Sequence, residues 1–339
     1  MKMKKTMIIV SLLCAFILMG LMGLSAGSRI AKTQQEPISG DFTAKVKDTE
    51  KGRELQLTLT IDSEREGKKR HSNMGFSLPL QDFSGLNPNA NGKTQFTLNR
   101  EAGTILFDGL FQDGRGVGDF RFTPNASFIS TMRGLGYDDI SLDNLFAMAI
   151  HDVSTGFINE MKALGYDRLP LDKLISFRIF KVDAEFIRRM QSLGYDRIPA
   201  DKLVALRIHG VTEEFITEFR GLGYDNVPLD KLIAMRIHGV SSKFVKEMND
   251  LGYRDIPVDK LIEFRIHGVS SEFVKGMNEA GFNNIPTEQL VAFRIHGVSP
   301  SFVKEMRELG FNNLTADDLV KLRIHGVDSE YVKRMKGVK

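Results

Sequence analysis

Cysteine is almost missing from this chain of 339 residues, because Cys14 is its only one. A single thiol can neither form an internal disulfide nor build a cysteine-based zinc site. A surplus of one charge is missing as well, since 46 basic residues face 43 acidic ones, and Lys2, Lys4 and Lys5 account for the difference. The chain beyond these lysines is neutral. Nucleic-acid binding needs a basic face, so we expect no nucleic-acid partner.

Familiar enzyme motifs are also missing. The sequence contains no His-Glu-x-x-His zinc motif and no complete phosphate-binding loop. Its glycine cluster from Gly114 to Gly118 is expected between strands, whereas a nucleotide-binding glycine loop opens a helix. We therefore predict a protein without enzymatic activity, and assign it no cofactor and no catalytic, cofactor-binding or metal-binding residue.

The N-terminus has the pattern of an export leader. Lysines precede an apolar run from Met7 to Leu24, and small polar residues follow from Ser25. Residues 1–27 are predicted to form either a signal peptide or an uncleaved membrane anchor, because this run is just long enough to span a bilayer. Residues 28–38 are predicted to be a linker. We expect the rest of the chain outside the cytoplasm, periplasmic or extracellular, and at the membrane only through the N-terminal segment.

From about residue 124 onward the sequence repeats itself every 29 residues. Seven complete copies and a closing half copy follow one another without an insertion, so residues 124–339 are expected to form one array. Glycine, aromatic residues and leucine mark the period. The three registers are Gly136, Gly165, Gly194, Gly223, Gly252, Gly281 and Gly310; Phe128, Phe157, Phe186, Phe215, Phe244, Phe273, Phe302 and Tyr331; and Leu145, Leu174, Leu203, Leu232, Leu261, Leu290 and Leu319.

Within one copy, residues 241–253 predict a short helix. Phe244 and Met248 are four positions apart, which places them on the same helix face. Ser241 precedes the helix and is suited to cap its free N–H groups. Gly252 follows it, at the left-handed position with which many helices end.

Residues 257–269 predict a second helix, which begins after Pro257 and ends at Gly268. Each helix has only about ten residues, and helices below about 12 residues are marginal in water on their own. We therefore predict an α-solenoid, in which each copy covers the apolar side of the next. The positions expected in its core are Phe244, Val245, Met248, Leu251, Tyr253, Ile256, Leu261, Ile262, Ile266 and Val269.

The closing half copy, residues 328–339, is expected to cap this array. Tyr331, Val332 and Met335 are predicted to face inward, while the lysines and the arginine between and after them face water. Such a polar outer side is what an end copy of a repeat protein needs for solubility.

The segment before the array has a different period. Apolar and polar residues alternate, as they do from Leu55 to Ile61, and this alternation is typical of half-buried antiparallel strands. We predict six short strands in residues 39–123, with one face closed by the first repeat helix. The charged run from Asp62 to His71 is expected to be a solvated hairpin tip. The predicted fold class is α+β, with an antiparallel β-domain at 39–123 followed by the helical array.

Histidine, arginine and acidic residues recur in columns along the array. The histidines suggest a metal ladder, but packed helices lie about 8–10 Å apart and a zinc–nitrogen distance is about 2 Å, so equivalent histidines cannot share an ion. We interpret them as residues that face carbonyl groups at helix ends. The columns are His209, His238, His267, His296 and His325; Arg178, Arg207, Arg236, Arg265, Arg294 and Arg323; and Asp143, Asp172, Asp201, Asp230, Asp259, Glu288 and Asp317.

Arginines of this column are the candidate surface residues. One hypothesis is that they pair with the acidic column of a neighbouring copy and cap its carbonyl groups. The alternative is an anion-binding strip along the array. The candidates are Arg207, Arg236, Arg265, Arg294 and Arg323.

The repeat unit from Leu203 to Ile216, together with Gly103 to Phe111 and Phe120 to Pro124, resembles the extracytoplasmic tail of some bacterial membrane metallopeptidases of the β-lactam-sensor type, and of exported proteins with the same repeats. The resemblance covers nearly all of the chain after the leader. It implies a bacterial envelope protein, but no peptidase activity, because the catalytic part and its zinc motif are missing.

The function expected from these patterns is that of an interaction or sensing module, which binds an unidentified protein or peptide in the envelope through the surface of its solenoid. The alternative is a structural spacer or scaffold of the envelope. Variation between copies distinguishes the two: a binding module should show surface positions that differ non-randomly along one concave face, whereas a spacer should not.

Overall fold

A computed structural model describes residues 37–337, apart from residue 51 and residues 66–67. The predicted leader at residues 1–27 and most of the predicted linker lie outside the described residues. Within the described part of the chain, no helix is long and apolar enough to cross a membrane.

The N-terminal part is one antiparallel sheet with the strand order β3-β2-β1-β7-β6-β5-β4. Six strands were predicted, and the seventh is the two-residue β4, which follows a single 3-10 turn at Leu80–Asp82. Pairing of β1 with β7 joins the first three strands to the last four. The strands are β1 (Ser39–Thr49), β2 (Gly52–Arg65), β3 (Lys68–Pro79), β4 (Phe83–Ser84), β5 (Gly92–Arg100), β6 (Gly103–Gln112) and β7 (Arg115–Pro124).

Alternation places one set of side chains in the core, as predicted. Leu55, Leu57 and Leu59 are fully buried, and the rings of Phe96 and Phe107 stack at 4.7 Å. Apart from residues 66–67, the charged run at 62–71 forms the paired end of the β2–β3 hairpin and not a loop: β2 and β3 stay in register from Asp62–His71 to Arg65–Lys68.

Helices fill the rest of the chain in pairs, so the predicted two-helix repeat and α+β class are confirmed. We call α2, α4, α6, α8, α10, α12, α14 and α16 the first helices of their copies, and α3, α5, α7, α9, α11, α13 and α15 the second helices. The first helices are Ala126–Gly134, Thr155–Ala163, Ala184–Ser192, Glu213–Arg220, Ser242–Asp250, Ser271–Glu279, Pro300–Glu308 and Ser329–Lys336. The second helices are Leu142–Ile150, Leu171–Ile179, Ala200–Ile208, Leu229–Ile237, Val258–His267, Thr287–His296 and Ala316–Ile324.

The helices α10 and α11 have the ends predicted for residues 241–269. The Ser241 side chain accepts the Phe244 N–H at 3.1 Å at the start of α10. Gly252 has φ +90°, and the Tyr253 N–H returns to the Met248 carbonyl at 3.0 Å. α11 likewise ends at left-handed Gly268. These caps satisfy backbone groups that a short helix would otherwise expose.

The core differs from the prediction at two positions of the second helix α11. Phe264 is fully buried although it was not expected in the core, and Ile266, which was expected there, is 54% exposed. The closing helix α16 differs too. Val332 is buried, but Tyr331 is 43% and Met335 72% exposed, because no second helix follows α16 in the described chain to cover them.

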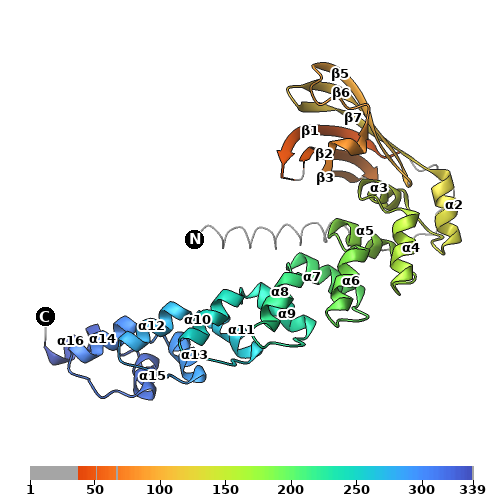
Figure 1. Ribbon diagram of the computed structural model, residues 1–339. Helices are drawn as coiled ribbons and strands as arrows, with labels where there is room; N and C mark the ends of the chain where they lie inside the picture. Colours follow the sequence, from red (N-terminus) through yellow and green to blue (C-terminus); the bar gives the residue numbers. More distant parts are fainter. Residues whose placement is uncertain (1–36, 51, 66–67, 338–339) are drawn as a thin grey trace.

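Contacts between copies run from first helix to first helix and from second helix to second helix. The result is an elongated array that extends away from the sheet (Figure 1). The sheet is covered by α3, through β5, β6 and β7, rather than by the first repeat helix α2 as predicted. Phe146 of α3 stacks on Phe120 at 5.8 Å and contacts Phe122 at 5.3 Å. The β-domain therefore joins the core of the first copy.

Candidate functional site

Second helices carry a row of exposed isoleucines. Ile237, Ile266, Ile295 and Ile324 occupy the same position in α9, α11, α13 and α15, and their exposed fractions are 44%, 54%, 55% and 56%. A single exposed aliphatic residue needs no explanation, but four at the same position of consecutive packed helices place an exposed apolar side chain at a regular interval along the array. We call these four residues the isoleucine row.

An acidic residue stands seven positions before each member of the row. Seven residues are nearly two helical turns, so the acid and the isoleucine lie on the same side of the helix, about 10 Å apart. The side chains of Asp230, Asp259 and Glu288 are 77%, 71% and 76% exposed. The isoleucine row is thus flanked by a parallel row of carboxylates.

These carboxylates pair with lysines, not with the arginines that we had predicted. Each lysine reaches from one second helix to the acid on the next, because 28 residues separate the partners. We call this set the lysine–acid ladder. Its pairs are Lys173–Asp201, Lys202–Asp230, Lys231–Asp259 and Lys260–Glu288.

The candidate arginines bind within the array. Nε of Arg207 donates to the Phe180 carbonyl at 3.1 Å, at the end of the preceding second helix. Nε of Arg236 and of Arg294 does the same to the carbonyls of His209 and His267, in each case at 3.3 Å. The guanidinium groups also lie over phenylalanine rings of their own copies, at 4.8–5.1 Å from the ring centroid. These pairs are Arg207–Phe186, Arg236–Phe215, Arg265–Phe244, Arg294–Phe273 and Arg323–Phe302.

This geometry favours the carbonyl-capping hypothesis over the anion-binding strip. A helix C-terminus carries partial negative charge, which attracts a guanidinium and repels an anion. Stacking on a ring fixes each arginine in place and occupies one face of its guanidinium. Arg265 and Arg323 are exceptions: both lie over a phenylalanine ring but neither donates to a carbonyl, and Nε of Arg323 is buried without a hydrogen-bond partner among the described residues.

Tyrosine forms a third link between copies, which the sequence analysis did not find. In the first five copies, the tyrosine after the glycine that ends the first helix donates its hydroxyl to a carbonyl 32 residues further along, at 2.7–2.9 Å. Burial raises the pKa of all five hydroxyl groups, so they stay protonated as donors. We call these bonds the tyrosine clamps. They are Tyr137–Leu169, Tyr166–Ile198, Tyr195–Val227, Tyr224–Ile256 and Tyr253–Ile285.

A fourth link joins first helices. A glutamate on one first helix accepts the hydroxyl of a serine at the start of the next, 24 residues further along. We call these contacts the glutamate–serine bridges. They are Glu218–Ser242, Glu247–Ser271 and Glu305–Ser329.

Histidines stand at or next to the ends of the second helices, as interpreted from the sequence. Burial lowers the pKa of His209. His151, the earlier outlier of this column, is more strongly affected: burial, with a contribution from the positive charge of Arg178, lowers its pKa to about 4. Among the described residues, no group of three or more histidine, cysteine, aspartate or glutamate side chains could hold a metal ion.

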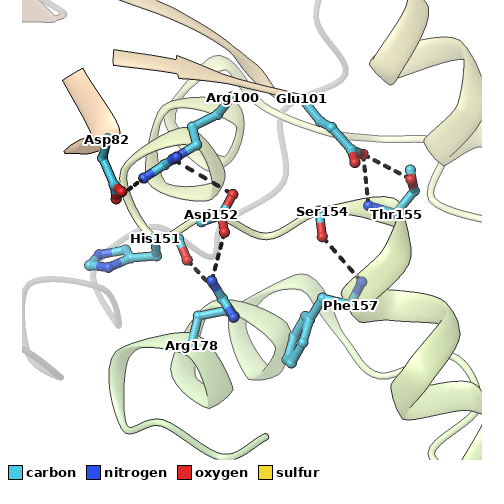
Figure 2. Close-up of polar contacts among 9 residues, drawn as sticks. All are labelled: Asp82, Arg100, Glu101, His151, Asp152, Ser154, Thr155, Phe157 and Arg178. Atoms are coloured by element: carbon cyan, nitrogen blue, oxygen red, sulfur yellow. Dashed lines mark hydrogen bonds and ion pairs between the residues drawn. The ribbon is translucent and has the colours of Figure 1, made fainter. Parts of the chain in front are cut away.

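Polar contacts fix the β-domain to the array (Figure 2). Arg100, at the end of β5, pairs with Asp82 at 2.5 Å and with Asp152 at 3.6 Å. Asp152 also binds Arg178 of α5 at 2.8 Å. On the other side of this junction, the carboxylate of Glu101 accepts both the backbone N–H and the hydroxyl of Thr155, at 2.9 and 2.8 Å, at the start of α4. Side chains of the sheet therefore hold the first two copies.

Comparison with known proteins gave no match to a family model, to a curated protein or to a solved structure. The resemblance to the tail of β-lactam-sensor-type metallopeptidases therefore stays a prediction, and the interpretation of function depends on the site geometry.

Proposed function

We propose that this chain is an exported, non-enzymatic interaction module of the bacterial envelope, and that its isoleucine row binds an amphipathic helix of a partner protein. The export pattern at residues 1–27 and the resemblance of the repeats support the location. The observation that carries the binding role is the row itself. The other leucines, isoleucines and valines of the array are buried or half-buried in the described residues, whereas Ile237, Ile266, Ile295 and Ile324 are exposed.

Spacing favours a helical partner. Neighbouring packed helices lie about 8–10 Å apart, so successive isoleucines are presented at about this interval. A helix with an apolar residue at every seventh position repeats it every ~10.5 Å, which matches the row closely. A strand places its side chains on one face every ~6.6 Å and loses register after one contact.

Charge defines one flank of that partner. The carboxylates of the lysine–acid ladder project into water with more than two thirds of their side chains exposed, while the lysines are 20–44% exposed. A helix lying on the isoleucine row would have one edge beside these carboxylates. Lysine or arginine on that edge would gain from their field.

The test compares two quadruple variants of the full chain. In one, the four isoleucines of the row are replaced by asparagine; in the matched control, the lysines of the exposed row on the first helices, Lys246, Lys275, Lys304 and Lys333, are replaced by serine. Labelled helical peptides with leucine at every seventh position and lysine on one flank are titrated by fluorescence anisotropy. Wild type and control are expected to bind the peptide with lysine on the flank, and the isoleucine variant to lose at least tenfold in affinity.

Envelope extract supplies the second arm of this test. Proteins retained by wild type and by the lysine control, but not by the isoleucine variant, would be partners of the row. Equal retention by all three proteins, or equal peptide binding by the isoleucine variant, contradicts the proposal.

The alternative function, a spacer of the envelope, is favoured by a different observation. Tyrosine clamps and the lysine–acid ladder link successive copies from first to sixth, which stiffens the array. A spacer would keep its activity in the isoleucine variant and lose it when copies are deleted, so the same variant distinguishes the two functions.

A further inference from the structure

Four kinds of polar link recur at three or more junctions between neighbouring copies: tyrosine clamp, lysine–acid ladder, arginine–carbonyl bond and glutamate–serine bridge. Each of the five junctions from the first to the sixth copy has at least two of them. The junction between the fifth and sixth copies has all four: the Tyr253 clamp, Lys260–Glu288, the Arg294 bond and Glu247–Ser271.

At the next junction, where α12 and α13 meet α14 and α15, the same four positions make none of these links. Phe282 stands in the tyrosine position and has no hydroxyl, and Gln289 stands in the lysine position. Arg323 stacks on its ring, but its Nε has no acceptor. Gly276 and Pro300 replace the glutamate and the serine of the bridge.

Two buried polar groups are left over at this place. Nε2 of Gln289 and Nε of Arg323 are both buried without a hydrogen-bond partner in the described chain. A buried donor without an acceptor loses its bonds to water and gains nothing in return. The junction therefore lacks the stabilising links and also has unsatisfied buried donors.

What remains at this junction is apolar packing and weak surface contacts. Lys304 and Glu279 pair at 3.9 Å with more than half of each side chain exposed, and Arg307 lies 5.7 Å from the centroid of the Phe282 ring. Exposed ion pairs of this kind contribute little. The loss of all four links at one junction, and at none of the five before it, does not follow from a gradual decay of the repeat.

We propose that the junction between the sixth and seventh copies is a weak joint of the array, at which α14, α15 and α16 open from the rest as a unit. In an array stabilised by contacts between neighbours, the weakest interface is where partial opening occurs. The joint divides the isoleucine row, because Ile295 lies before it and Ile324 after it. This inference concerns the fold and holds whether or not the row binds a helix.

Hydrogen exchange of the full chain, followed by mass spectrometry, tests the joint. We expect amides in α14 and α15 to exchange at least tenfold faster than those in α10 and α11, with a step between α13 and α15 instead of a gradual change. The repair variant Phe282→Tyr with Gln289→Lys places a hydroxyl opposite the Leu314 carbonyl and an ammonium opposite Asp317. It should slow exchange in α14 and α15 about tenfold for the restored clamp, which is the effect of about 1.4 kcal/mol, and by a smaller factor for the lysine–acid pair, whose carboxylate is exposed.

Two further variants keep this test decisive. Phe311→Tyr is the matched control, because Phe311 is 37% exposed, so the added hydroxyl can bond to water and should leave exchange unchanged. Tyr224→Phe with Lys231→Gln removes a clamp and a ladder pair from an intact junction, and should create a new step between α9 and α11.

Equal protection of α11 and α15 in the wild type would overturn the proposal. A step that persists unchanged in the repair variant would also overturn it. So would the absence of a new step in the variant Tyr224→Phe with Lys231→Gln. The last outcome is independent of whether the repair variant folds.

Discussion

At the scale of single residues, the array depends on polar groups that reach from one copy into the next. The tyrosine hydroxyl is the simplest of them, because it meets one carbonyl and the residue otherwise packs like phenylalanine. The sequence contains both residues at this position: Phe282 and Phe311 replace the tyrosine in the last two copies.

Tyr224→Phe should therefore lower the free energy of unfolding by about 1 kcal/mol, because the buried Ile256 carbonyl loses its donor. Urea denaturation followed by circular dichroism measures the change. Tyr331→Phe is the control: Tyr331 is 43% exposed, so this substitution should change stability by less than about 0.5 kcal/mol. Equal effects of the two substitutions would show that the clamp contributes nothing.

Gly276 and Pro300 are matched to each other across α12 and α14. A Cβ added at Gly276 would lie 2.8 Å from Cγ of Pro300, closer than real contacts allow. Gly276→Glu alone should destabilise the chain by about 1–3 kcal/mol through overpacking. Gly276→Glu combined with Pro300→Ser should recover most of this loss, because the pair then matches Glu247 and Ser271. Additive effects in a double-mutant cycle would contradict the coupling.

His151 makes stability depend on pH. Its pKa of about 4 in the folded chain lies below the ordinary 6.5, so between these values the unfolded chain takes up a proton that the folded chain does not. Stability is therefore fully present above about pH 6.5 and falls as the pH decreases, by about 2 kcal/mol at pH 5. Urea denaturation at pH 7.5 and pH 5 should show this loss in the wild type and a smaller one in His151→Gln. An identical loss in both proteins would exclude His151 as its source.

At the scale of elements, the sequence predicts where helices begin and end, because serine caps and glycine ends act locally. It predicts less well which side of a helix is buried. Ile266 was expected in the core as an apolar residue of the repeat, but the buried residues of α11 are Leu261, Ile262 and Phe264. Ile266 and the neighbouring Arg265 both lie on the exposed side of the helix, and the Arg265 guanidinium lies over the Phe244 ring.

Interactions between elements were the least predictable part of the site. The tyrosine clamps span 32 residues and the ladder 28, and neither distance follows from the spacing within a copy. Exposure of the isoleucine row could not be predicted for the same reason, since it depends on which neighbour covers which arc. The arginine column was found from its period alone, but the choice between capping and anion binding needed the carbonyl positions.

Replacing Arg236, Arg265 and Arg294 together by glutamine tests that choice. Each substitution removes a guanidinium stacked on a phenylalanine ring. Those at Arg236 and Arg294 also remove a hydrogen bond to a carbonyl. We expect the free energy of unfolding to fall by about 3–6 kcal/mol in urea. Titration with inorganic phosphate should leave the wild-type midpoint unchanged. A stable triple variant, together with a phosphate effect present only in the wild type, would favour the anion-binding strip instead.

At the scale of the whole molecule, a β-domain and an array form one continuous core. Phe146 of the first copy packs on the sheet at Phe120, and Arg100 of β5 pairs with Asp152, just before the second copy. From there each copy covers the next, and α16 ends the series with an apolar side that no helix covers in the described residues. Position along the array therefore determines how well a copy is held, although all copies share one sequence pattern.

Mutual stabilisation of neighbouring copies is the claim on which this account depends most, and circular dichroism of a single copy tests it directly. A peptide of residues 241–269 should be largely unfolded at 20 °C, because each of its helices has only nine or ten residues and its apolar faces have no neighbours. The full chain under the same conditions should be helical and unfold cooperatively. A peptide as helical and as heat-resistant as the full chain would contradict the account.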